Sequence, residues 1–173
     1  IIGLHPIHTD KSYHDEQELG VGNESFASKG EVFDKDAYRE LAKSKKVVGI
    51  GECGLDYYRS DASTKQKQIK AFEEQIELAV ELNLPLMLHV RTSSRESDDA
   101  YLDTLDILEK YKVKFPELKG NCHFFAGSPE IAKRFLDLGF FLSFNGVITF
   151  TSDYDEVVKL VPLEKMLTET DCP

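Results

Sequence analysis

Side chains able to bind metals or transfer protons recur at one kind of place in this 173-residue chain, directly after short apolar stretches. Five residues share that placement: His5, Glu52, His89, His123 and Asp171. From Glu52 onward they lie roughly one β-strand and one α-helix apart, so a parallel α/β fold would gather them at one edge. Imidazole and carboxylate groups together suit a divalent cation such as Zn²⁺, Mn²⁺ or Mg²⁺. The pattern therefore predicts a site for one or two metal ions, with Glu52, His89, His123 and Asp171 as ligands.

A structural explanation competes with this one. A single histidine after a strand is more often a core or capping residue than a metal ligand. Buried carboxylates without partners are costly, however, so separate structural explanations for four such residues would each need their own compensation. The shared placement therefore favours the metal site.

The apolar stretches themselves predict the elements that would position these residues. Six of them are typical of strands: 1–4, 47–51, 85–88, 120–122, 140–144 and 166–170. The clearest helical pattern follows the capping-box pair Ser63 and Gln66, with apolar residues at three- and four-residue steps through Val80. Strands that alternate with helices in this way indicate a parallel sheet.

The remaining segments predict further helices and one long connection. One helix should begin with Ser128 as its N-cap and Pro129 as its first residue, and should end at Gly139. Residues 8–29 have no hydrophobic period and several acidic side chains, which predicts either a lid or, in the preferred interpretation, a loose solvated loop. Weaker helical patterns cover 34–45, 98–111 and 153–160, the last with Ser152 as a candidate cap.

Composition limits the class of protein. The formal net charge of −10 argues against a broad basic surface for nucleic acid. The apolar stretches are far shorter than the ~18 residues of a membrane span, so no membrane association is expected. Cysteines without a C-x-x-C pair indicate a reducing compartment, and we expect a cytoplasmic protein. Cys53, Cys122 and Cys172 each neighbour a predicted ligand, so their side chains should point the opposite way, into the core beneath the helices.

Several short motifs together resemble the TatD family of metal-dependent hydrolases, in the family's order and over almost the whole chain. They are GLHP at 3–6, GECGLDYY at 51–58, LHVR at 88–91, HFFAG at 123–127, GVITF at 146–150 and ETDCP at 169–173. Any one of these motifs would be weak, but the ordered set is highly specific.

The resemblance implies a (β/α)₈ TIM barrel, with about six of the eight βα units present in a single domain over 1–173. It implies that Glu52 can bridge two metals, that His89 and His123 are imidazole ligands, and that Asp171 is the ligand at the last strand. Glu169 resembles the family's second acidic residue, a water orienter or proton acceptor. His5 matches the histidine that contacts substrate or a metal-bound water, although a structural role for it stays open.

The chain also departs from the family pattern. The His-x-His pair of the family's first strand is absent, and HFFAG stands where the family usually has His-Cys-Phe-Ser-Gly. The chain has 173 residues, against ~250 for a typical barrel of this kind, and it does not begin with Met. We therefore expect a domain that is incomplete at both ends, lacking the first strands and the C-terminal end.

The resemblance implies a deoxyribonuclease in which metal-activated water hydrolyses phosphodiester bonds, with DNA or another phosphodiester as substrate and no obligate protein partner. Two alternatives stay open. One is an amidohydrolase-type esterase or deacylase, for example acting on D-aminoacyl-tRNA, and the other is a truncated, non-catalytic barrel. Arg91 could orient a phosphate, but an ion pair is the preferred interpretation. For Tyr57 and Tyr58, packing is preferred to base stacking.

Overall fold

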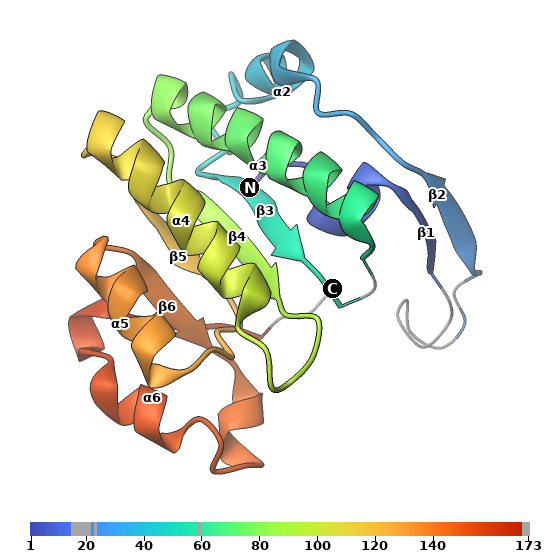
Figure 1. Ribbon diagram of the computed structural model, residues 1–173. Helices are drawn as coiled ribbons and strands as arrows, with labels where there is room; N and C mark the ends of the chain where they lie inside the picture. Colours follow the sequence, from blue (N-terminus) through green and yellow to red (C-terminus); the bar gives the residue numbers. More distant parts are fainter. Residues whose placement is uncertain (15–21, 23, 59, 171–173) are drawn as a thin grey trace.

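A five-stranded parallel sheet organises the chain (Figure 1). The computed structural model describes residues 1–14, 22, 24–58 and 60–170. The strands neighbour one another in chain order: β3 Ile50–Asp56, β4 Leu86–Arg91, β5 Gly120–Cys122, β6 Phe141–Phe144 and β7 Met166–Thr168. Because each strand lies parallel beside the next, all their carboxyl ends lie at one edge.

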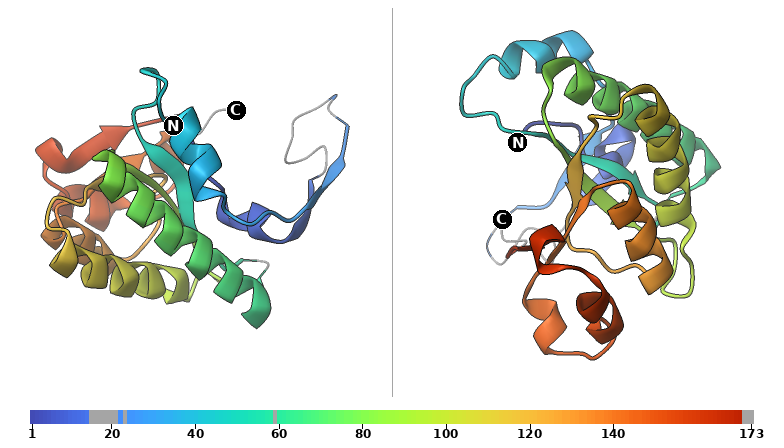
Figure 2. Two further views of the ribbon diagram at one scale, coloured as in Figure 1. Left: turned by 90° about the horizontal axis from the view of Figure 1, so that it is seen from above. Right: turned by 90° about the vertical axis from the view of Figure 1, so that its left-hand side faces the viewer.

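Helices connect the strands, and the three longest gather on the same side of the sheet (Figure 2). The α-helices are α2 Lys35–Leu41, α3 Ala62–Leu82, α4 Asp99–Lys114, α5 Pro129–Asp137 and α6 Asp155–Leu160. Short 3₁₀ helices cover η1 Pro6–Thr9, η2 Gly146–Thr149 and η3 Leu163–Lys165. Within the described part of the chain, every helix is too short or too polar to span a bilayer. A consecutive parallel sheet with helices along one face matches the wall of a (β/α)₈ barrel, as expected.

Five of the six predicted strands are present in the main sheet and in the predicted order, and the sixth is reduced to a single bridge. Ile2 forms an isolated parallel bridge with Ile50, so the predicted strand 1–4 contributes only this contact at the edge of β3. The strand predicted at 47–51 lies at Ile50–Asp56 instead. Glu52 is therefore inside a strand and does not follow one.

Capping side chains decide where the helices begin. The Ser128 hydroxyl accepts a hydrogen bond from the Ile131 N–H, as predicted for the N-cap of α5. The prediction of Ser63 as the cap of α3 was wrong, because the N-cap is Asp61, two residues earlier, whose carboxylate accepts a hydrogen bond from the Thr64 N–H. The Ser152 prediction was also wrong, since the N-cap of α6 is Tyr154.

The expectation of a loop over residues 8–29 was wrong for the parts that the structure describes. β1 Lys11–His14 and β2 Phe26–Lys29 form a separate antiparallel pair, set apart from the main sheet (Figure 1). The hydroxyl groups of Ser12 and Ser28 lie 2.8 Å apart across the pair. The pairing rests on backbone hydrogen bonds between polar strands, so no apolar alternation marks it in the sequence.

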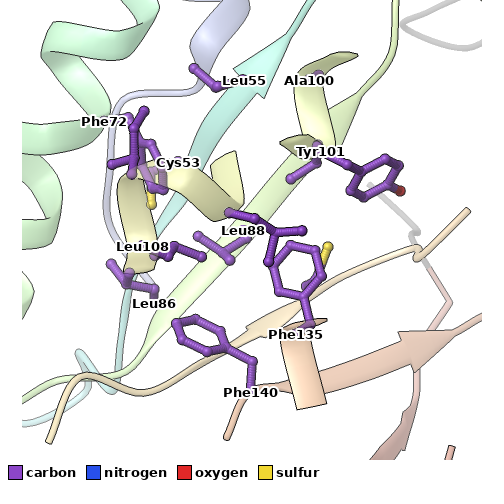
Figure 3. Packing of buried hydrophobic residues seen from close by; sticks show 14 of the residues in the cluster. Cys53, Leu55, Phe72, Leu86, Leu88, Ala100, Tyr101, Leu108, Phe135 and Phe140 are labelled. Atoms are coloured by element: carbon purple, nitrogen blue, oxygen red, sulfur yellow. The ribbon is translucent and has the colours of Figure 1, made fainter. Parts of the chain in front are cut away.

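The core lies between the sheet and its helices (Figure 3). Cys53 and Leu88 from the sheet pack with Phe72 of α3 and Phe135 of α5. Cys53 and Cys122 are fully buried free thiols, which confirms the predicted direction of their side chains, and burial raises the pKa of both thiols. Cys172 lies outside the described residues.

Candidate metal centre

Glu52 stands at the centre of a group of imidazoles. Its Oε2 lies 3.3 Å from His123 Nε2, 3.6 Å from His5 Nε2 and 3.9 Å from His89 Nδ1. The contact with His123 lowers the pKa of Glu52 to about 2, so the carboxylate is ionised at neutral pH. One negatively charged oxygen thus faces ring nitrogens from three separate segments of the chain.

A bulge in β3 turns Glu52 toward this group. Gly51 pairs with Met87 and Cys53 pairs with Leu88, so Glu52 is the extra residue in the register. Gly54 has φ +137°, and a Cβ there would lie 2.2 Å from the backbone carbonyl oxygen of His89. Only glycine allows β3 to approach β4 this closely, which brings the Glu52 and His89 strands together.

His89 lies within β4 and contacts carboxylates through both ring nitrogens. Its Nε2 is 3.0 Å from Oδ2 of Asp56, and its Nδ1 faces Glu52. Burial is the largest single effect and favours the protonated form of Asp56. The hydrogen bond and charge of His89, the Tyr58 N–H and the charge of Arg91 together outweigh it, so the pKa of Asp56 is lowered. Asp56 therefore acts as an ionised hydrogen-bond acceptor for His89.

His123 follows β5 and has a similar carboxylate partner. Its Nδ1 lies 3.5 Å from Oε2 of Glu169. The other oxygen of Glu169 accepts hydrogen bonds from the Ser143 hydroxyl, at 2.7 Å, and from the Phe124 backbone N–H. The structure thus places Glu169 against an imidazole, and its predicted role toward water stays a prediction.

His5 precedes η1 and points its Nε2 at Glu52. Its Nδ1 accepts a hydrogen bond from the Ile7 N–H at 3.3 Å, which caps η1. Burial, followed by the nearby His89, lowers the pKa of His5 to about 3, so the ring is neutral at physiological pH. A neutral ring whose Nδ1 accepts carries its proton on Nε2. His5 therefore presents an N–H donor to the centre.

A cavity of about 730 Å³ opens above these groups. Four of its lining residues are the imidazoles and the carboxylate already described, and two arginines and two tyrosines lie nearby in the same cavity: Tyr58, Arg91, Arg95 and Tyr154. The Arg91 guanidinium lies 3.9 Å from the ring centroid of Tyr58. Tyr57, in contrast, is buried and donates a hydrogen bond to Asp103, a packing role.

The donor set suits a divalent cation. His5, Glu52 and His89 offer ligand atoms within 4.8 Å of one another, and His123 adds a fourth group beside Glu52. Imidazole nitrogen and carboxylate oxygen are the donors that Zn²⁺ and Mn²⁺ take in proteins. Because His5 turns an N–H toward the centre, Glu52, His89 and His123 fit the role of ligands better.

Five of the six predicted site residues are brought together, and the sixth lies outside the described residues. The five are His5, Glu52, His89, His123 and Glu169. Asp171 is the one that the structure does not describe. Sequence reasoning assigned no role to Asp56. Its signal was present, because a residue four positions after Glu52 in a strand lies on the same side.

Comparisons with known proteins identify the family of the chain. The family model described as "TatD related DNase" matches residues 1–173. The metal-dependent hydrolase YcfH of Escherichia coli K12 is 38% identical over 148 residues, which are 84% of this chain and 52% of YcfH. Deoxyribonuclease Tat-D of Schizosaccharomyces pombe is 36% identical over 175 residues, covering 99% of this chain and 50% of that protein.

Solved structures give the same result. The TatD homologue YJJV of E. coli superimposes with a TM-score of 0.72 at 27% identity, over 99% of this chain and 57% of that one. A TatD family hydrolase of Entamoeba histolytica gives 0.70 at 27% identity, over 99% and 49%. The chain spans about half the length of the curated relatives it matches. Because the family model matches the whole chain and the relatives and solved structures agree with it, the chain belongs to the TatD-related DNase family.

Proposed function

We propose that this protein is a divalent-metal-dependent hydrolase that cleaves phosphodiester bonds in DNA. The observation that carries the proposal is the single Glu52 oxygen within 3.9 Å of three imidazole nitrogens. This cluster of polar groups lines a cavity and contributes little to the stability of the fold, because apolar side chains packed at the same place would stabilise it more. Its chemistry suits cation binding.

Glu52, His89 and His123 would hold the cation, with Asp171 as the further ligand that the sequence predicts. A bound divalent cation would supply Lewis-acid polarisation of a phosphoryl oxygen and a nucleophilic water at neutral pH. His5 supports the reaction differently, because its Nε2–H can donate to an oxygen of the substrate or of water. Glu169 keeps the His123 ring in place.

The cavity supports a substrate that carries phosphate. Arg91 and Arg95 line the same cavity as the imidazoles, although the chain as a whole is acidic. Guanidinium groups bind phosphate oxygens in a bidentate manner. Tyr58 lies under Arg91 and is half exposed, so an aromatic face is available beside the guanidinium. Two arginines in one cavity can bind the few phosphates at the end of a DNA strand, whereas a long DNA duplex would need a more extended basic surface.

The proposal is tested by giving the whole protein a choice of substrates. The metal is removed with a chelator, and the protein is reloaded separately with Mg²⁺, Mn²⁺ or Zn²⁺. Fluorescent single-stranded DNA, duplex DNA and an aminoacyl-tRNA ester are then compared under the same conditions. We expect metal-dependent cleavage of DNA, with single-stranded ends cleaved best. Hydrolysis of the ester with the DNA left intact would replace the proposal with the deacylase alternative.

A further inference from the structure

Asp56 is a buried carboxylate that contacts His89, one of the residues proposed to bind the cation. It ends β3, its residue is 5% exposed, and its two oxygens face different partners. Oδ2 lies 3.0 Å from His89 Nε2, and Oδ1 accepts a hydrogen bond from the Tyr58 N–H at 3.0 Å. Both oxygens are thus used, and neither is among the atoms that face Glu52.

A glutamine from the helical layer holds the backbone of Asp56. Gln68 of α3 is 1% exposed, and its Oε1 accepts from the Asp56 N–H at 2.8 Å. Its Nε2 donates to the Asp56 carbonyl at 2.8 Å and to the Ser60 hydroxyl at 3.0 Å. A buried polar side chain used in this way fixes the end of the strand. Gln68 therefore fixes the backbone from which the Asp56 carboxylate projects, and the Tyr58 N–H holds one oxygen of that carboxylate.

The two distances decide which nitrogen of His89 is available. Both neighbours are carboxylates and can only accept, but Asp56 lies 3.0 Å from Nε2, within hydrogen-bond distance, whereas Glu52 lies 3.9 Å from Nδ1. The proton of the neutral ring therefore resides on Nε2 and the lone pair on Nδ1. Nδ1 is the atom that faces Glu52. Histidines that bind metals commonly donate their other N–H to a carboxylate, which orients the ring and raises its basicity.

We infer that Asp56 is a positioning residue that fixes the tautomer and orientation of His89 so that Nδ1 is presented to the cation. The inference rests on the proposed function for the presence of that cation. It adds Asp56 to the site as a residue that acts on the cation indirectly, through His89.

His5 provides the contrast that makes the inference specific. The ring centroids of His5 and His89 are 4.2 Å apart, and both rings are expected to carry the proton on Nε2. In His5 that proton is turned toward Glu52, and in His89 it is turned away. The partner of Nδ1 in His5 is the Ile7 backbone, which a change at Asp56 leaves in place.

The first test is the tautomer of each ring in the metal-free whole protein, labelled with ¹⁵N-histidine and studied by multiple-bond ¹H–¹⁵N NMR above the ring pKa. His89 is assigned through the signal lost in His89→Gln. We expect an Nε2-protonated His89 in the wild type. In Asp56→Asn the amide offers a neutral acceptor or a donor to Nε2, so His89 should shift toward Nδ1 protonation while His5 is unchanged.

The second test is metal affinity, measured by equilibrium dialysis with Mn²⁺ alone. Asp56→Asn should bind about 10- to 100-fold more weakly, as for other carboxylates behind metal-binding histidines. The matched control is Asp103→Asn, which also removes a carboxylate that accepts from a ring side chain, here the Tyr57 hydroxyl at 2.8 Å. The control should bind Mn²⁺ with wild-type affinity.

The outcomes separate this inference from the proposed function. An Nδ1-protonated His89 in the wild type, or Asp56→Asn with wild-type affinity, overturns the role of Asp56. If Asp56→Asn does not fold, the wild-type spectrum still decides the tautomer. If the tautomer and affinity are as expected but DNA is not cleaved, the proposed substrate fails and the positioning role stands.

Discussion

The two sides of β3 and β4 carry different kinds of residue. On one side Glu52 and His89 face the cavity, surrounded by polar groups. On the other, Cys53 and Leu88 are completely buried against α3, α4 and α5 (Figure 3). Because successive side chains alternate between the faces, adjacent residues serve different purposes. The same two strands thus present the candidate metal ligands on one side and the side chains that stabilise the core on the other.

The sharpest way to separate the two sides is Glu52→Gln. Loss of the charge should reduce DNA cleavage by roughly 10²- to 10³-fold or more, because the carboxylate that the imidazoles surround is gone. Glu52 is half exposed, so the free energy of unfolding should fall by no more than about 1 kcal/mol. Turnover assays and urea denaturation of the same preparation measure both quantities.

A matched control exists on the helical layer. Glu77→Gln removes an exposed carboxylate of α3 that contacts Lys35. It should change neither turnover nor stability measurably. Equal loss of turnover in both variants would mean that general charge, and not the position of Glu52, matters.

The opposite change is Phe135→Ala on the buried side. Phe135 is fully buried, and its ring packs edge to face against Phe125 and Tyr101. The cavity left behind should lower the free energy of unfolding by about 3–5 kcal/mol. Val113→Ala, at a position 84% exposed on α4, should change it by less than about 0.5 kcal/mol.

Turnover per folded molecule should stay near wild type in Phe135→Ala, measured well below its denaturation midpoint. A loss of metal affinity together with stability would show that the two sides of the sheet are coupled, and would contradict the view that they have separate roles.

Much of this division could be predicted from the sequence. Alternation placed Cys53 and Cys122 opposite the ligands, and both are buried. The spacing of Glu52, His89 and His123 by strand-and-helix units predicted their convergence, which the structure shows. These predictions succeed because they depend on the two-residue period of a strand and on strand order, which are properties of the backbone.

Other features depend on local contacts that spacing alone does not reveal. Spacing places Asp56 on the same side of the strand as Glu52, but its contact with His89 also depends on a bulge and two glycines that let β3 approach β4 closely. Asp61 outcompetes Ser63 as the cap of α3, although the capping-box pattern favoured the serine. The β1–β2 pair joins polar strands, so hydrophobic periodicity gave no signal for it.

Cys122→Ser tests the boundary between the two sides, since Cys122 neighbours His123 in the chain. A hydroxyl in a fully buried apolar place should cost about 1–3 kcal/mol of stability. The number of Mn²⁺ ions bound per chain should not change, because the thiol faces the core. Reduced metal stoichiometry, measured by elemental analysis, would show that the side chain reaches the centre.

Cys53→Ser is the comparison for that variant. The thiol of Cys53 lies 3.7 Å from the Met87 carbonyl oxygen and 4.0 Å from that of Ile50, so a hydroxyl there has acceptors nearby. Its loss of stability should be smaller than that of Cys122→Ser.

The smallest expected effect distinguishes two serines that look alike in sequence. Ser128→Ala removes the N-cap of α5, which should lower the free energy of unfolding by about 1 kcal/mol. Ser63→Ala should change it by less than about 0.5 kcal/mol, because the Asp61 carboxylate already accepts from the first turn of α3. Urea denaturation of both variants decides the matter. Equal losses would mean that both hydroxyls cap their helices, whereas a larger loss at Ser128 supports capping by Asp61.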